Sequence, residues 1–281
     1  MFPRIATIEH MCEGLSLFSE PTKAWFEHAF GQPTEAQAQA WPAIHSGRNV
    51  LVIAPTGSGK TLAAFLSAID RLMTVSRKRR AGVRVLYVSP LKALAVDVAK
   101  NLEQPLEGIA AQCEAQGLPA PKIAVANRSG DTTAQERRRI ASHPPDILVT
   151  TPESLYLLLT SKAGRILGTV DTVIVDEIHA VAGTKRGSHL ALSLERLENL
   201  VAESRRRDAM DRNDGESKVS DDSGNEPLLQ RIGLSATVNP PEEAARFLTG
   251  GRPVTIVNPG GRPAMDLRMV EPLENMRESI A

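Results

Sequence analysis

Short apolar runs recur along the chain, and stretches with a helical spacing of apolar residues separate them. The runs are apolar throughout rather than alternating, which is typical of strands buried on both faces of a parallel sheet. Helical candidates between them include TLAAFLSAIDRLM and HLALSLERLENLV. This order predicts a doubly wound α/β fold with a mostly parallel sheet. The expected strands are residues 49–53, 83–88, 122–126, 146–150, 172–175, 231–234 and 253–257.

Two segments break this alternation. Residues 203–227 are rich in charged residues, Ser, Gly and Asn and contain almost no large apolar residue, so we predict a mobile surface insertion there. Residues 258–281 begin with PGGRP and contain only one short apolar stretch, MDLRMV. The pattern therefore predicts one α/β domain over residues 1–257, followed by a linker-like segment.

Composition limits where a partner can bind and where the protein resides. Lys+Arg and Asp+Glu both number 33, so any nucleic-acid surface must be local rather than a property of the whole chain. Cys12 and Cys113 are too few and too far apart for a disulfide framework or a metal site, which favours a reducing cytosol. No run approaches the roughly 18 apolar residues of a membrane helix. We expect a cytoplasmic protein without a membrane partner.

Polar segments follow the expected strands, each just past a strand's carboxyl end. In an open parallel sheet those ends lie along one edge, where a crevice opens at the point at which strand order reverses. Residues more than a hundred positions apart are therefore expected to share one site. The segments, in chain order, are APTGSGKT, SPLKAL, RSGDT, TPES, DEIH and SAT.

The first of these segments resembles a phosphate-binding loop. APTGSGKT (54–61) matches the pattern G-x-x-x-x-G-K-[ST] except for Ala54. The glycines allow backbone N–H groups to turn inward, and the following helix directs its positive end at a phosphate. Lys60 would neutralise the β and γ phosphates, and the Thr61 hydroxyl would ligate Mg²⁺. A glycine-rich turn that caps a helix is the alternative. The residues expected to bind ATP here are Thr56, Gly57, Ser58, Gly59, Lys60 and Thr61.

The segment VDEIHA (175–180) ends an apolar run with two carboxylates and an imidazole. Desolvated acidic pairs cost free energy unless a cation accompanies them, and a magnesium–triphosphate would supply it. Asp176 would hold Mg²⁺ directly or through water, and Glu177 would orient and deprotonate the attacking water. His179 would hydrogen-bond towards the SAT segment and sense the γ-phosphate. The alternative is a solvated strand end.

Together with PTEAQ (33–37), these segments resemble motifs Q, I, Ia, Ib, II and III of the superfamily 2 helicases. The segments YVSPLKALAVDV and DEIHAVAGTKRGSHLALSLERL resemble more closely the large helicase-related (Lhr) group. The resemblance extends from about Leu15 to the end of the chain. It implies a RecA-like first lobe that binds ATP and Mg²⁺, and also the backbone of a single nucleic-acid strand.

The resemblance also implies roles for three further residues. Gln37 would read adenine, since an amide donates and accepts on one edge; otherwise it is a helix former on the surface. Ser235 and Thr237 would couple loss of the γ-phosphate to movement of the lobe. The alternative for these two hydroxyls is ordinary capping after a buried strand.

Helix ends predict where the strand lies. Ser89 and Thr151 are expected N-caps, each followed by a proline at the first helical position (Pro90 and Pro152), which leaves N–H groups free for phosphates. Such contacts position a backbone without reading bases, although the same caps also stabilise helices. The basic runs 77–80 and 137–139 are expected on solvated surfaces. Further contacts are expected from Lys92, Arg128, Thr132, Lys185 and Arg186.

Helicases of this superfamily place ATP between two RecA-like lobes, and arginines of the second lobe contact the γ-phosphate. We expect residues 258–281 to begin the interlobe linker and the second lobe to be missing from the chain. Arginine fingers are worth roughly 10³ to 10⁵ in rate, so this lobe alone would turn over slowly. The expected function is the motor lobe of an ATP-dependent 3′-to-5′ helicase, with DNA favoured over RNA. Alternatives are a non-catalytic nucleotide- or strand-binding module and a small-molecule kinase.

Overall fold

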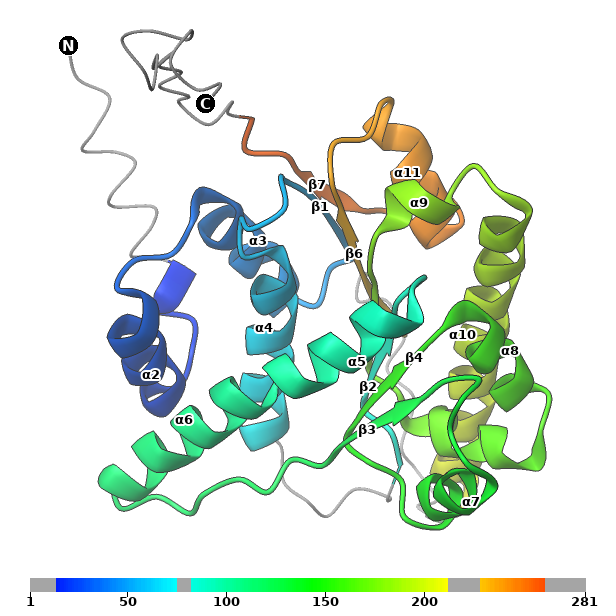
Figure 1. Cartoon of the computed structure of the whole chain (residues 1–281), viewed down its shortest axis with the longest axis horizontal. Coiled ribbons are helices and arrows are strands. Elements are labelled where there is room, and N and C mark those ends of the chain that lie inside the picture. The colour runs from blue at the N-terminus through cyan, green and yellow to red at the C-terminus, as the bar shows by residue number, and fades with distance from the viewer. Residues whose placement is uncertain (1–13, 75–81, 212–227, 261–281) are drawn as a thin grey trace, which may run out of the picture.

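The computed structural model describes residues 14–74, 82–211 and 228–260. Within these ranges, seven strands form one parallel sheet in the order β3-β4-β2-β5-β6-β1-β7. The sheet lies between two layers of helices (Figure 1), which confirms the doubly wound α/β prediction. The strands are β1 (Val50–Ile53), β2 (Val85–Val88), β3 (Val125–Arg128), β4 (Ile147–Thr150), β5 (Thr172–Val175), β6 (Gln230–Ser235) and β7 (Thr255–Val257).

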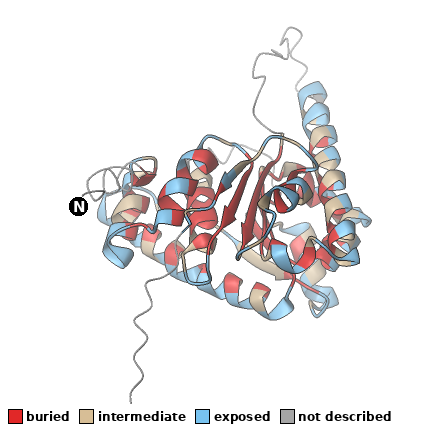
Figure 2. Ribbon diagram, turned by 90° about the horizontal axis from the view of Figure 1, so that it is seen from above, coloured by how far each residue is buried: buried red, intermediate tan, exposed pale blue. Residues whose placement is uncertain are grey.

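The period-2 geometry of the strands divides the core into two halves. Val50 and Val52 of β1 face one cluster of buried residues, whereas Leu51 and Ile53 face the other. Figure 2 shows the central strands as buried. One layer contains α2 (Glu20–Phe30), α3 (Glu35–His45), α4 (Lys60–Thr74), α5 (Lys92–Asn101) and α6 (Glu103–Ala115); the other contains α7 (Ala134–Ser142), α8 (Pro152–Leu159), η1 (Lys162–Thr169), α9 (Ile178–Val181), α10 (Lys185–Asp211) and α11 (Pro241–Thr249).

The predicted burial on both faces is correct for the inner strands of the sheet but wrong for the third expected strand, β3. β3 spans Val125–Arg128 rather than residues 122–126, and only its last residue is buried. The physical reason is its position, because β3 is an edge strand that pairs with β4 alone. Its carboxyl end therefore lies at the rim of the sheet.

The expected insertion at residues 203–227 is partly wrong. Residues 203–211 continue α10, which ends at Asp211. Arg205 on this extension pairs with Asp171 at 3.2 Å, and Ser204 is buried, so the charged run forms the exposed side of a packed helix. Residues 212–227 lie outside the described residues, as do the basic run 77–80 and residues 261–281 of the expected linker.

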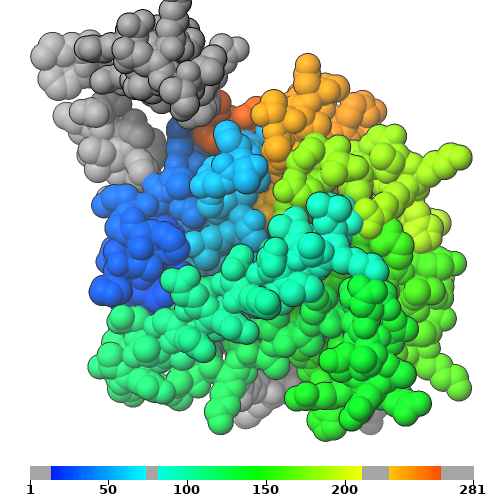
Figure 3. Space-filling model, in the orientation of Figure 1, coloured from blue at the N-terminus to red at the C-terminus, as the bar shows by residue number. Residues whose placement is uncertain are grey.

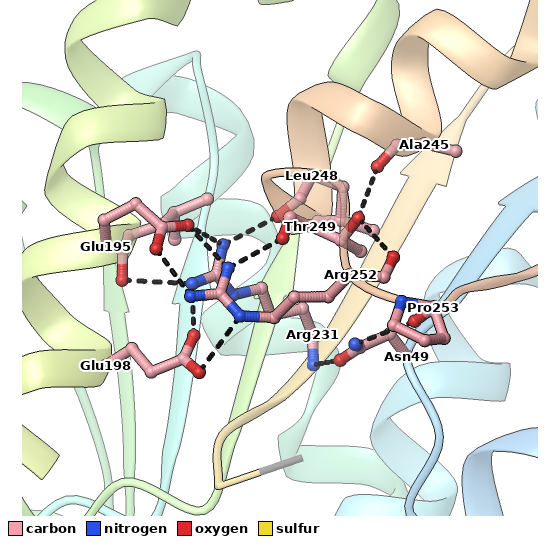
Figure 4. Close-up of polar contacts among 10 residues, drawn as sticks. Asn49, Glu195, Glu198, Arg231, Ala245, Leu248, Thr249, Arg252 and Pro253 are labelled. Carbon is pink, nitrogen blue, oxygen red and sulfur yellow. Dashed lines mark hydrogen bonds and ion pairs between the residues drawn. The ribbon is translucent and has the colours of Figure 1, made fainter. Parts of the chain in front are cut away.

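A buried arginine anchors the amino end of β6. The side chain of Arg231 is 1% exposed, and its guanidinium pairs with Glu195 at 2.9 Å and with Glu198. Arg252, which precedes β7, binds the same two carboxylates (Figure 4). These contacts join β6 to α10 and to the segment before β7. The other end of β6, Ser235, lies at the carboxyl edge of the sheet.

No helix in the three described ranges is both long and apolar enough to cross a bilayer.

Candidate nucleotide site and nucleic-acid edge

The loop after β1 has the backbone that a phosphate loop requires. Gly57 and Gly59 adopt φ angles of 81° and 77°, a region that strongly favours glycine. α4 begins at Lys60, as predicted. A Cβ atom at Gly59 would lie 2.4 Å from the Gln37 Nε2 atom, whereas one at Gly57 would meet nothing within 4 Å. Gly59 is thus required by its positive φ angle and by the close approach of Gln37, whereas Gly57 is required by its φ angle alone. Thr56 and Gly57 are exposed, and Ser58, Gly59 and Thr61 are half-buried.

Lys60 folds back over this loop. Its Nζ atom donates to the carbonyl oxygens of Ala54 and Pro55, at 2.5 and 2.8 Å. Burial lowers the pKa of Lys60, and the carboxylates of Glu177 and Asp176 act in the opposite direction. The two carbonyls are neutral acceptors, so a phosphate oxygen would be a stronger partner. The loop and the two carboxylates therefore belong to one site.

Asp176 is held by two donors from the protein. It is 4% exposed, and its Oδ1 atom accepts from the N–H of Glu177 at 2.8 Å. Its Oδ2 atom accepts from the hydroxyl of Tyr87 on the neighbouring strand β2. Burial, followed by the charge of Asp176, raises the pKa of Tyr87 far above its usual range, so this hydroxyl remains a donor. Tyr87 was not among the residues predicted from the sequence; its only signal there is a polar atom in a buried run, which needs a partner.

Glu177 has an unusual backbone conformation. Its φ and ψ angles are 49° and 45°, and in the described part of the chain it is the non-glycine residue with positive φ. Left-handed backbone at a non-glycine residue costs on the order of 1 to 3 kcal/mol and concentrates at active sites. The Glu177 side chain is 30% exposed, so solvent reaches its carboxylate.

His179 connects the segment after β5 to the segment after β6. Its Nδ1 atom accepts from the backbone N–H of Ala236 at 3.2 Å and lies 3.3 Å from the Ser235 Oγ atom. The expected hydrogen bond towards SAT is therefore present. Nδ1 also lies 3.3 Å from the Glu177 Oε2 atom. Because an Nδ1 atom that accepts from an N–H carries no proton, this last contact is not an ion pair in that state. Thr237 is exposed.

Gln37 is buried rather than a helix former on the surface. It is 4% exposed and forms a capping box with Thr34 at the start of α3. Its Oε1 atom accepts from the N–H of Thr34 at 2.9 Å, and its Nε2 atom donates to the carbonyl of Gly59 at 3.3 Å. The Thr34 hydroxyl donates to the Ser58 carbonyl at 2.8 Å. An amide with one bond at each end retains one further donor and one further acceptor.

The residues present fit Mg²⁺ bound to a nucleotide. Among the described residues, no group of three or more His, Cys, Asp or Glu side chains could hold a metal ion by itself. Mg²⁺ in phosphate sites needs fewer protein ligands, because waters and phosphate oxygens complete its shell. Thr61 and Asp176, with oxygen donors, would hold it here.

Of the two predicted helix starts, the one after Thr151 is confirmed and the one after Ser89 is wrong. α8 begins at Pro152, and the Thr151 hydroxyl caps it by accepting from the N–H of Ser154 at 3.4 Å. α5, however, begins at Lys92 rather than at Pro90, and Ser89 is not its cap. The Ser89 hydroxyl donates to the Leu91 carbonyl at 3.1 Å, so it stabilises a local turn that competes with the helix.

The other residues expected at this edge differ in how available they are. Lys92 pairs with Asp131 at 2.9 Å while both stay well exposed. Arg186 is bound by both oxygens of Glu153, one at 3.0 Å, so its charge is largely compensated. Lys185 is exposed, Arg128 is 9% exposed, and the Thr132 hydroxyl accepts from the N–H of Ser129 at 2.8 Å.

A protein-family match to the chain agrees with the residues of this site. The model of the DEAD/DEAH box helicase family matches residues 34–245. The chain belongs to the DEAD/DEAH box helicase family. The helicase match covers every segment from the capping box at Thr34 to α11. It confirms the resemblance to superfamily 2 helicases.

Similar helicases come from the Lhr group. The chain is 55% identical to "Lhr helicase/ probable uracil glycosylase" of Mycolicibacterium smegmatis over 93% of its own length, but spans only 16% of that protein. It is 40% identical to "ATP-dependent helicase Lhr-Core" of Methanocaldococcus jannaschii over 92% of its length and spans 28% of that protein.

Solved structures of helicases show the same fold. The structure of Mycobacterium smegmatis helicase Lhr bound to ssDNA and AMP-PNP matches with a TM-score of 0.74 and 57% identity, over 87% of this chain and 28% of that one. The DEAD-box helicase Mss116 matches with a TM-score of 0.66 at 17% identity, over 86% of this chain and 43% of that one, which supports the RecA-like fold alone.

Proposed function

We propose that this chain is the ATP-binding motor lobe of an ATP-dependent nucleic-acid helicase. One observation supports the proposal: the phosphate loop after β1 and the DEIH segment after β5, far apart in sequence, lie at the same carboxyl edge of the parallel sheet, where the charges of Glu177 and Asp176 act on Lys60. The strained backbone of Glu177 and the bond from Gln37 to the loop support it.

Hydrolysis follows from the placement of these side chains. Lys60 exchanges its two carbonyl partners for phosphate oxygens, because a charged acceptor makes the stronger bond. Thr61 and Asp176 would hold Mg²⁺, which would neutralise charge on the phosphates. Glu177, with a solvent-accessible carboxylate, orients the attacking water and accepts its proton. Tyr87 keeps the Asp176 carboxylate in one orientation.

Coupling to movement runs through His179. Its bonds to Ser235 and Ala236 connect the segment that carries Glu177 to the end of β6. A shift of Glu177 after loss of the γ-phosphate therefore reaches the SAT segment. Thr237, which is exposed and follows Ala236, would contact a second lobe.

The nucleic-acid strand lies along the same carboxyl edge, at the start of α8 and beside the β3–α7 turn. The support is the start of α8, which follows the carboxyl end of β4 and carries the positive end of the helix dipole, and the ssDNA named for the similar Lhr structure. The assignment of DNA as the substrate and of 3′-to-5′ movement rests on the resemblance. The contacts proposed at this edge are to phosphates, which position a strand and carry no sequence information.

Full turnover requires arginines from a second RecA-like lobe. We expect these 281 residues to bind nucleotide with a slow turnover, and a separately produced second lobe to restore strand-stimulated phosphate release. The second candidate function is a non-catalytic nucleotide- or strand-binding module. Phosphate release should be measured with and without the second lobe; fast release by the chain alone refutes the dependence on a second lobe, and none in either case favours the module.

The substrate class needs its own measurement. Labelled single-stranded DNA and RNA should be titrated with the chain in the presence of a non-hydrolysable ATP analogue. Binding of either strand supports the proposal, and tighter binding of DNA supports the DNA assignment. Binding of neither strand would refute nucleic-acid contact at this edge.

A further inference from the structure

An ion pair joins the first turn of α8 to the first turn of α10. The carboxylate of Glu153 on α8 accepts from Arg186 on α10 with both oxygens: Oε2 accepts from Nη2 at 3.0 Å, and Oε1 accepts from Nε. A bidentate pair of this kind fixes the orientation of its partners as well as their separation. Hydrogen bonding to Arg186 lowers the pKa of Glu153, and hydrogen bonding to Glu153 raises the pKa of Arg186. Both groups therefore stay charged near neutral pH and hold the two helix starts together.

Stability alone does not account for this pair. The side chains of Glu153 and Arg186 are 55% and 39% exposed. Ion pairs at such exposed positions are screened by solvent and contribute little to the free energy of folding. The place of the pair is more informative, because Glu153 lies at the start of α8, where the proposed function puts the nucleic-acid strand. The pair thus connects that site to α10.

A single hydroxyl connects the start of α10 to the end of α9. The Thr184 hydroxyl donates to the Val181 carbonyl at 2.8 Å and accepts from the N–H of Gly187 at 3.0 Å. The N–H of Thr184 also donates to the Val181 carbonyl, at 2.9 Å. Arg186 lies between Thr184 and Gly187, so it belongs to the turn of α10 that these bonds hold against α9.

Gly187 brings the two helices into direct contact through their main chains. This residue is buried, and a Cβ atom there would lie 2.0 Å from the Val181 carbonyl oxygen and 3.3 Å from the Ala182 Cα atom. Both neighbours are main-chain atoms, which cannot turn aside as the end of a flexible side chain can. A displacement of Arg186 and Gly187 is therefore passed on to α9.

α9 directly follows Glu177, the proposed base. Glu177 is the N-cap residue of this four-residue helix, and its carbonyl accepts from the N–H of Ala180 at 2.8 Å. A helix this short forms few hydrogen bonds of its own, so its place depends on what it packs against. The left-handed backbone of Glu177 likewise persists only where the surrounding structure holds it. The contact between α9 and α10 is therefore placed to set the position of Glu177.

These elements lie on one side of the molecule. In Figure 3, which has the orientation of Figure 1, the green of α8 borders the yellow-green of α9 and α10. In the sheet, β4 leads into α8 and β5 leads into the DEIH segment, and β2 separates the two strands. The helices thus connect two strand ends that the sheet does not make neighbours.

We propose that Arg186 is a positioning residue for Glu177, which together with Glu153 transmits occupancy of the strand site at α8 to the carboxylate that activates water. The path is continuous: α8 is bound to α10 by the ion pair, α10 to α9 by Thr184 and Gly187, and α9 follows Glu177. A strand that favours one position of α8 then favours one position of Glu177. This inference rests on the proposed function. It changes the role of Arg186, which was predicted from the sequence to contact the strand directly.

The test compares phosphate release by the motor completed with its second lobe, without a strand and with saturating oligo-dT. Arg186→Gln and Glu153→Gln should each reduce the stimulation by the strand about fivefold or more, the lower end of ordinary coupling between two sites. Their affinities for fluorescent oligo-dT should be unchanged. Arg186→Lys should retain part of the stimulation, since it keeps the charge and loses the bidentate fork. A merely structural role would lower the melting temperature without changing the ratio of stimulated to basal rate.

Arg246→Gln is the matched control, because it makes the same change in another exposed ion pair, with Glu243 on α11. It should leave the ratio of rates and the strand affinity unchanged.

A direct contact between Arg186 and the strand gives opposite signs in the two variants. Arg186→Gln would then weaken strand binding, whereas Glu153→Gln would strengthen it by freeing the guanidinium group. That result, or full stimulation in both variants, would overturn the positioning role and leave the proposed function intact. Failure of the unaltered motor to bind the strand would overturn nucleic-acid binding together with this inference.

Discussion

The ammonium group of Lys60 and the carboxylate of Asp176 lie close enough for their charges to interact, although Lys60 begins α4 and Asp176 follows β5. β1 and β5 are not direct neighbours, since β6 lies between them. Parallel strands nevertheless deliver both residues to the same edge of the sheet. The motor chemistry proposed for this chain depends on that meeting.

Glu177→Gln should preserve nucleotide binding and stop hydrolysis, because the amide keeps the shape of the side chain but cannot accept the proton of the attacking water. Binding of a fluorescent ATP analogue and phosphate release by the motor completed with its second lobe are the two measurements. Lys60→Ala is the contrasting variant, which should abolish binding. Unchanged turnover in Glu177→Gln would remove Glu177 as the base.

Tyr87→Phe should raise the Mg²⁺ concentration needed for nucleotide binding by roughly tenfold, because Asp176 loses one charge-assisted hydrogen bond. The aromatic ring of Tyr87 stacks on Phe65 with centroids 5.0 Å apart, and this stacking should be retained in the variant. Analogue binding is to be titrated against Mg²⁺ and repeated in EDTA. A variant equally weakened in EDTA would point to general damage of the fold instead.

Gly59→Ala should abolish nucleotide binding, whereas Gly57→Ala should only weaken it. Both changes add a side chain to left-handed backbone, which costs roughly 1 to 2 kcal/mol. Only at Gly59 would the new Cβ atom also meet Gln37, at 2.4 Å from Nε2. Melting temperature and analogue affinity together measure this difference. Equal losses in the two variants would show that the contact with Gln37 does not matter.

Arg231→Met should destabilise the chain by about 3 kcal/mol, since it leaves Glu195 and Glu198 beside a buried position with only one of their two cations. The exposed pair Arg246–Glu243, at 3.2 Å, offers a control, because Arg246→Met should cost less than about 1 kcal/mol. Urea denaturation gives both free energies of unfolding. Similar values for the two variants would contradict a structural role for the buried cluster.

Acid should weaken this cluster in a predictable direction. Arg252 and Arg231 lower the pKa of Glu195 from its ordinary value of 4.5. A carboxyl with a lowered folded-state pKa contributes stability above 4.5 and loses it as pH falls through the folded-state pKa. Glu195→Gln should therefore be less stable than the unaltered chain at neutral pH. As pH falls below 4.5, the variant should lose less stability than the unaltered chain does. The free energy of unfolding of both proteins should be measured by urea denaturation at a series of pH values. A constant difference between Glu195→Gln and the unaltered chain at every pH would be inconsistent with this pairing.

Local patterns were sufficient to predict much of this protein. The strand–loop–helix unit around Lys60, the cap at Thr151 and the six polar strand ends each follow from a few adjacent residues. Parallel strands then place the polar ends at one edge without further information. The fold class and the proximity of Lys60 to Asp176 could thus be predicted from the amino-acid order.

Other features required the tertiary structure, because their partners are distant in the chain. Nothing near Tyr87 indicates that its hydroxyl meets Asp176, and nothing near Arg231 indicates that Glu195 and Glu198 surround it inside the core. The partly buried guanidinium groups of Arg128 and Arg137 likewise face each other only after β3 and α7 pack together. Pairing of polar groups in the interior depends on which elements become neighbours, and a linear pattern does not specify that.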